Sequence, residues 1–164
     1  METTELRPPR GEEIPNHPTL PVLVYRGIDA LGDGPAAAEG LITGNGWGGT
    51  WRDGVFAFHH FHSVSHEALA VVAGRARLAI GGPQGEAVDV AAGDALVLPG
   101  GTGHKRIDAS ADFLVVGAYP PDQEDYDVRR GDPAEREEVE GNIAAVALPP
   151  GDPFGGPLAE AWGL

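Results

Sequence analysis

The sequence predicts an all-β fold, a sandwich or a barrel, from three observations. Short apolar runs, many rich in β-branched residues, follow one another through the middle of the chain. Gly, Pro or Asp bounds each run, and 25 Gly with 15 Pro in 164 residues are typical of a fold with many tight turns. The series has no convincing helical period. The expected strands are residues 21–27, 55–62, 67–73, 75–80, 86–91, 95–98, 104–108 and 112–119.

The two ends of the chain differ in composition from this central region. Pro35 favours the start of a short helix over residues 34–42, and Asp132-Pro133 with its following glutamates favours a second helix near the C-terminus. Residues 142–148 indicate a final strand. We therefore expect a polar, proline-containing N-terminal arm (1–20), a single barrel domain (21–148) and a Pro/Gly-rich C-terminal tail (149–164).

Charge and composition exclude several classes of function. The formal net charge of −14 argues against nucleic acid as a partner, because phosphate binding needs clustered Lys and Arg. It also argues against an anionic membrane surface, and no apolar run approaches the ~20 residues that span a bilayer. The N-terminus does not resemble a signal peptide, and without cysteine there is no disulfide or thiolate ligand. We expect a cytoplasmic protein.

Residues 59–67, "HHFHSVSHE", hold four of the six histidines of the chain. On a strand, residues two apart share one face and are separated by a rise of about 6.6–7 Å. His60 and His62 would therefore project to the same side, where both imidazoles can reach one metal ion at ~2.0–2.1 Å. His59 has the opposite parity and is expected to face outward.

Two residues compete for a further ligand position next to this pair. Simple alternation favours His66, which shares the parity of the first two histidines. Glu67 instead shares the parity of Leu69 and Val71, the bulkier apolar residues that follow it. If that larger set faces the core, the chain switches parity in a turn or bulge over residues 63–65. We favour Glu67 and keep His66 as the alternative.

Two stretches of the sequence together resemble the paired motifs of the cupin superfamily. Residues 54–74 read Gly, five residues, His-x-His, four residues, Glu, six residues, Gly. Residues 93–108, "GDALVLPGGTGHKRID", match the second motif except that Asp108 stands where Asn is usual. The motifs occur in the correct order and 18 residues apart. The chain thus resembles small single-domain bacterial cupins, in a branch of unassigned function.

This resemblance implies a cupin-type jelly-roll barrel with one divalent metal ion inside. The implied ligands are His60, His62, Glu67 and His104, with His66 as the alternative to the glutamate. Three imidazoles and one carboxylate leave coordination positions open, and they suit Fe, Mn, Ni or Zn without selecting one.

The expected function is that of a metal-dependent enzyme acting on a small organic substrate, by oxygenase-type or isomerase/lyase-type chemistry. A non-catalytic ligand-binding or sensor protein is the alternative. No catalytic residue is assigned, although Asp108, His66 and Tyr119 are candidates for groups around the metal, and Trp47 or Trp51 for the barrel mouth. Because residues 21–27 have no adjacent hairpin partner in sequence, we also expect a homodimer, assembled through the outer face of the barrel or by exchange of the N-terminal arm. The alternative is that this strand folds back onto its own barrel.

Overall fold

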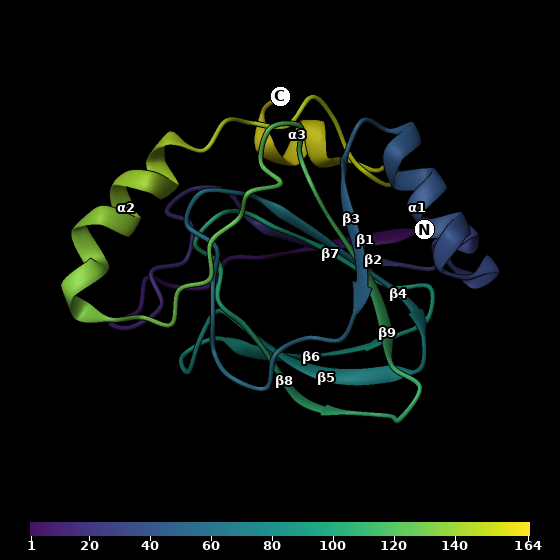
Figure 1. The fold of residues 1–164 in the computed structure, drawn as a ribbon, viewed down its shortest axis with the longest axis horizontal. Helices are drawn as coiled ribbons and strands as arrows, with labels where there is room; N and C mark the ends of the chain where they lie inside the picture. Colours follow the sequence, from purple (N-terminus) through teal and green to yellow (C-terminus); the bar gives the residue numbers. More distant parts are fainter.

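The computed structural model describes residues 1–164 and contains two antiparallel sheets (Figure 1). The larger sheet has the order β1 (Glu2–Leu6), β2 (Val22–Arg26), β7 (Ala95–Leu98), β4 (Glu67–Ala73), β9 (Leu114–Tyr119) and β3 (Gly48–Asp53). The smaller sheet has the order β6 (Glu86–Ala91), β5 (Arg75–Ile80) and β8 (His104–Ala109). The architecture is the all-β jelly-roll barrel that the sequence predicts.

Five short helical segments surround the sheets. They are η1 (Asp29–Asp33), α1 (Pro35–Gly44), η2 (Pro133–Glu135), α2 (Arg136–Ala145) and α3 (Leu158–Trp162). Figure 1 shows α1 and α3 on the side of the larger sheet that faces away from β5, β6 and β8. None of these helices combines the length and apolar character needed to cross a membrane.

Both faces of the central strands of the larger sheet are buried, each against a different layer. Leu69 and Val71 of β4 pack with Leu78 of β5 in the cluster between the two sheets. The alternate residues of β4, including Ala70, pack beneath the helical layer in a cluster that contains Trp162 of α3. Neighbouring residues of β4 therefore enter two separate cores, and the side on which a residue of this strand lies decides what it can contact.

The strand boundaries predicted for β4, β5, β6 and β7 match the structure, whereas the strand predicted over residues 55–62 is wrong. That segment is a loop with isolated bridges from His60 to His104 and from Phe61 to Arg129. The strand beside β9 is instead β3, which lies in a segment whose glycines favour a turn by sequence. A Cβ on Gly117 of β9 would lie 2.1 Å from the Trp51 ring, so the glycine allows this tryptophan to cross β9.

Residues 1–20, expected as an arm, lie against the barrel. Strand β1 pairs with β2 from Glu2↔Arg26 to Leu6↔Val22 and β7 pairs with its other side, so the strand over residues 21–27 is covered within its own barrel, as in the alternative to dimer pairing. Asn16 is buried, and its side-chain amide donates to the carbonyl of Gly81 at 3.0 Å. The partner strand comes from the polar segment that begins the chain.

The final strand predicted over residues 142–148 is also wrong, because α2 continues to Ala145. Val139 and Ile143 lie one helical turn apart and pack with Phe61 in a small separate cluster. The tail over residues 149–164 is fixed by Asp152, which accepts a hydrogen bond from the buried Tyr25 hydroxyl at 2.7 Å.

Candidate metal centre

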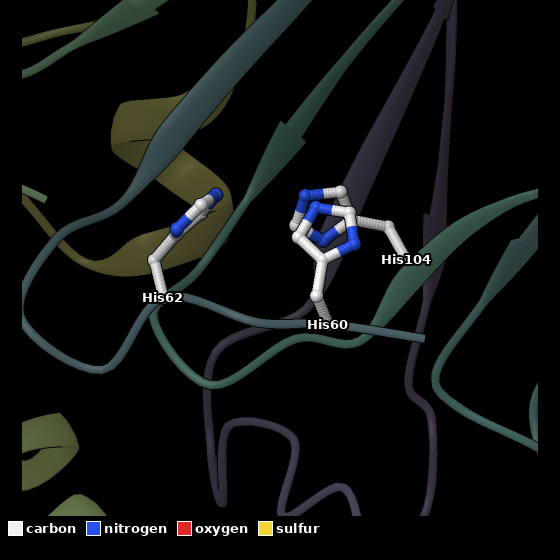
Figure 2. Close-up of side chains that lie close together, drawn as sticks. All are labelled: His60, His62 and His104. Carbon is white, nitrogen blue, oxygen red and sulfur yellow. The ribbon is translucent and has the colours of Figure 1, made fainter. Parts of the chain in front are cut away.

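Three buried histidines from different parts of the chain meet inside the barrel. One ring nitrogen from each of His60, His62 and His104 lies within 4.8 Å of the others. The ring centroids are 4.0 Å apart for His60 and His104, and 5.3 Å apart for His62 and His104. Figure 2 shows the three rings turned toward a common region, two from the loop before β4 and one from the start of β8.

A tight glycine turn delivers His104 to this region. Gly101 has a positive φ of 90°, which an L residue with a side chain rarely adopts. A Cβ on Gly103 would lie 2.5 Å from a side-chain carbon of Ile14. The turn before β8 thus requires glycine at both positions, and it begins the strand directly at the histidine.

Backbone carbonyl groups set the tautomer of all three rings. The Nδ1 atoms lie close to carbonyl oxygens, His60 to Phe58 at 3.0 Å, His62 to Asp127 at 2.5 Å and His104 to Thr102 at 3.0 Å. A carbonyl oxygen only accepts hydrogen bonds, so each neutral ring carries its proton on Nδ1. The three Nε2 lone pairs are left free, which is the arrangement that orients histidine as a metal ligand.

Glu67 completes the group with a fully enclosed carboxylate. Its Oε2 lies 2.6 Å from Nε2 of His62 and 3.4 Å from Nε2 of His104. That oxygen has no hydrogen-bond partner in the structure, because the facing nitrogens carry lone pairs in the tautomer described above. Contacts between lone pairs are favourable only with a proton or a cation between them. The donor set therefore fits a divalent cation.

The electrostatics of the cluster agree with this fit. Burial raises the pKa of Glu67, but His62 and His104 lower it more, so the carboxylate stays ionised. Burial, assisted by the neighbouring His104, lowers the pKa of His60 to about 3. Burial also opposes a charge on His62, yet the Glu67 carboxylate outweighs it and raises the pKa of that imidazole. The buried anion thus favours a positive charge beside it, which a proton on His62 or a bound cation can supply.

His66 lies outside the cluster, beneath the helical layer. Its Nδ1 accepts a hydrogen bond from the backbone N–H of Gly100 at 2.9 Å, and its ring centroid is 4.8 Å from that of Trp162. Burial, assisted by the nearby His17, lowers the pKa of His66 to about 3. Residues 63–65 lie in a bend between His62 and β4. Across this bend the face to which even-numbered residues project changes, so Glu67 rather than His66 lies on the side of His62.

A network around Asp127 supports His62, and nothing in the sequence indicates it. The carboxylate of Asp127 accepts hydrogen bonds from the backbone N–H and the hydroxyl of Ser63. The main-chain carbonyl of Asp127 accepts a hydrogen bond from Nδ1 of His62. Arg129 donates to the same carboxylate at 2.7 Å and to Glu135 at 2.7 Å. The network joins the segment before α2 to a candidate ligand across more than 60 positions of sequence, where no spacing rule applies.

The buried residues of the cluster line a cavity of about 410 Å³. Its apolar and aromatic lining consists of Trp51, Val55, Phe56, Ala57, Leu69, Tyr119 and Tyr126, and its other charged residues are Arg52, Asp53 and Arg106. The indole N–H of Trp51 donates to the Tyr119 hydroxyl at 2.8 Å. A volume near the lower end of the range for ligand pockets suits a small molecule.

The remaining predicted residues take different positions. Trp51 lines the cavity, whereas Trp47 is buried elsewhere and donates to the carbonyl of Gly151 at 2.9 Å. Asp108 is exposed, outside the cavity lining, and accepts a hydrogen bond from the N–H of Ala109. His59 is half-buried and does not join the three-histidine group.

Comparisons with known proteins agree with the fold and the motifs. The family profile described as the cupin domain matches residues 52–117. The chain is 43% identical over 157 residues to the uncharacterized protein YjlB of Bacillus subtilis, covering 94% of this chain and 93% of that protein.

Two solved structures match parts of the chain at low sequence identity. An acireductone dioxygenase from Bacillus anthracis with a cadmium ion has 16% identity and a TM-score of 0.45, covering 62% of this chain and 79% of that one. A DUF861 family protein from Thermotoga maritima has 15% identity and a TM-score of 0.36, covering 58% and 96%.

Proposed function

The chain belongs to the cupin family, and we propose that it is a metal-dependent enzyme acting on a small organic molecule. The proposed metal ligands are His60, His62, Glu67 and His104. The observation that carries the proposal is the convergence of three Nε2 lone pairs and one unpartnered carboxylate oxygen at the end of a cavity. Other buried polar groups of the barrel have no such arrangement of free acceptors.

The donor types agree with Fe, Mn, Ni or Zn, which imidazole and carboxylate ligands suit. Such an ion supplies Lewis-acid polarisation or, as iron, oxygen-dependent oxidation. The protein supplies the enclosure. Leu69 and Val55 contribute apolar surface to the cavity lining, and Trp51 donates a hydrogen bond to the Tyr119 hydroxyl.

Tyr119 is the side chain best suited to hold a proton near the substrate. Its oxygen accepts the Trp51 hydrogen bond, so its own O–H remains available to donate. Burial and the nearby Glu67 carboxylate raise the pKa of Tyr119, which keeps the hydroxyl protonated at neutral pH. We therefore assign Tyr119 as a hydrogen-bond donor to a substrate in the cavity.

Metal content is the first test. Elemental analysis of protein expressed without a histidine tag should find about one divalent ion per chain. A consistent absence of metal, even after incubation with each of the four ions, would overturn the proposal.

Turnover is the second test. Metal-restored protein should be offered small carboxylic acids, phenols and sugars, with oxygen uptake and product spectra as readouts. Activity should be present in His59→Ala and absent in His104→Ala. A protein that binds metal and ligands but converts none of them would be the non-catalytic binding or sensor protein instead.

A further inference from the structure

We propose that the substrate carries a carboxylate at the end remote from its reacting group, and that Arg106 binds this carboxylate at the cavity mouth. The inference rests on the proposed function, because it takes the metal centre as the opposite end of the same cavity. It names the chemical class of the substrate, a small carboxylic acid.

The register of β8 on β5 points Arg106 into the cavity. His104 pairs with Ile80 and Arg106 pairs with Leu78, whereas Lys105 pairs with Ala79. Directly opposite residues of an antiparallel pair project to the same face. Because Leu78 and Ile80 are buried between the sheets, the histidine and the arginine both project inward. Arg106 accordingly lines the cavity, and Lys105 does not.

Arg106 has no acidic partner, although the chain has 25 acidic and 11 basic residues. None of the ion pairs in the structure includes its guanidinium group. Arg52, the other arginine of the cavity lining, is paired with Glu39 at 2.5 Å. The exposed Asp53 accepts a hydrogen bond from the N–H of Gly54. One guanidinium group therefore remains free to bind an anion, and its planar fork matches a carboxylate.

The distance between the metal centre and Arg106 limits the length of the ligand. Two residues along a strand separate the backbone positions of His104 and Arg106 by about 6.6–7 Å. Phe56 lies on this path, since its carbonyl accepts the N–H of Arg106 at 2.9 Å and its ring packs edge-on against His60 at 5.1 Å. The Phe56 side chain is 52% exposed and offers an apolar surface to a short carbon chain. A carboxylate joined to the reacting group by such a chain fits both ends.

Hydroxamates test this inference, because they anchor on a metal and can carry different distal groups. The protein would be loaded with Co²⁺, and binding followed by the visible absorption of the metal. Succinic monohydroxamate is compared with butyrohydroxamate, in which a methyl group replaces the carboxylate, and the one-carbon-longer pair is measured in parallel. An ion-paired carboxylate should strengthen binding about 10-fold or more in at least one pair.

Three variants test whether Arg106 is responsible for the preference for the carboxylate-bearing ligand. Arg106→Gln should reduce the carboxylate preference to less than about 3-fold, and Arg106→Lys should retain part of it, because lysine keeps the charge without the fork. Lys105→Gln removes the same charge from the other face of β8 and should keep the full preference. Each variant must first bind Co²⁺ as the wild type does.

The outcomes separate the two proposals. If wild-type protein binds both hydroxamates of each pair equally, or if Lys105→Gln loses as much preference as Arg106→Gln, the assignment of Arg106 is overturned while the metal centre stands. If wild-type protein binds no Co²⁺, the proposed function itself is overturned, and this inference with it.

Discussion

His66 and Glu67 are neighbours in sequence and both are fully buried, yet they lie in regions with opposite chemistry. The glutamate enters the space between the sheets, where it faces His62 and His104. The histidine lies beneath the helical layer against Trp162, where its ring accepts a hydrogen bond from the backbone N–H of Gly100. The first region gathers groups with free lone pairs, and the second contains mainly apolar packing. The difference shows that strand parity, more than residue type, selects the candidate ligands.

The parity itself follows from the size of the side chains on β4. Leu69 and Val71 fill the wide space between the sheets, and the smaller Ala68 and Ala70 allow the helices to approach the other face. Glu67 shares the side of the larger residues. Its backbone pairs with Leu98 of β7, which fixes the register at this point. A one-residue slip would exchange the two environments.

The largest effect is expected from removing a histidine on the cavity side. His62→Ala and His104→Ala should each weaken divalent-metal affinity by more than about 100-fold, since loss of an outer-shell partner alone typically costs 10–100-fold. His59→Ala, adjacent to the cluster, should change the affinity by less than about 2-fold. Competition titration with a metal-binding dye measures all three variants. Equal losses in all three would indicate that the cluster is not a specific site.

The next largest effect is expected from substituting, one at a time, the two neighbouring residues that lie on opposite faces of β4. Glu67→Gln should weaken metal binding about 10–100-fold, because the amide retains the shape but not the charge. His66→Gln should leave metal binding unchanged and lower the free energy of unfolding by about 1–3 kcal/mol, because it disturbs the acceptor of the buried Gly100 N–H. Metal titration and urea denaturation of both variants provide the readouts. Metal loss in His66→Gln with retention in Glu67→Gln would reverse our choice of ligand.

A smaller effect is expected one layer outside the cavity. Asp127→Ala removes the acceptor of Ser63 and the partner of Arg129, so the segment that holds His62 should shift. We expect metal affinity to fall by about 10-fold. Asp89→Ala, which removes an exposed carboxylate of an exposed ion pair, is the matched control and should have no effect. Unchanged affinity in Asp127→Ala would show that the backbone alone positions the histidine.

The sequence predicts the strands between the two motifs well because local signals bound them. Gly74 and Gly93 adopt positive φ values of 70° and 101°, so glycine marks these turns in the sequence and in the structure alike. The loop of His60 and His62 is different, because its extended conformation depends on single bridges to distant residues. The HxH spacing indicated two neighbouring imidazoles although the segment is no strand.

The remaining differences arise from contacts that local patterns do not encode. Strand β3 depends on the fit of Trp51 over Gly117, residues 66 positions apart in sequence. Helix α2 continues through Ile143 because that residue packs with Phe61 and Val139, whereas "NIAAVAL" in isolation has the composition of a strand. The contact of Asp127 with His62 joins residues 65 positions apart, and Arg106 lines the cavity through the register of β8 on β5, so no local pattern indicates either residue.

The smallest effect on the metal site is expected from changes at the edge of the larger sheet, because β2 and β7 separate β1 from β4. Because β1 pairs with β2 on one side only, β1 is one open edge of the sheet, and β3 is the edge at the other end. An unpaired edge is commonly covered by another chain. We therefore propose a homodimer, formed through this edge, by exchange of the N-terminal segment, or through the outer face of the barrel.

Sedimentation equilibrium distinguishes these modes. The full chain should have twice its monomer mass of 17.0 kDa. A version lacking residues 1–6 should become monomeric if β1 forms the contact, and its metal affinity should change little, because β2 and β7 separate β1 from β4. Deletion through residue 27 would be uninformative, since it removes the buried β2 as well. A dimer that survives the shorter deletion would place the contact on the outer face, and a full-length monomer at micromolar concentration would exclude the dimer.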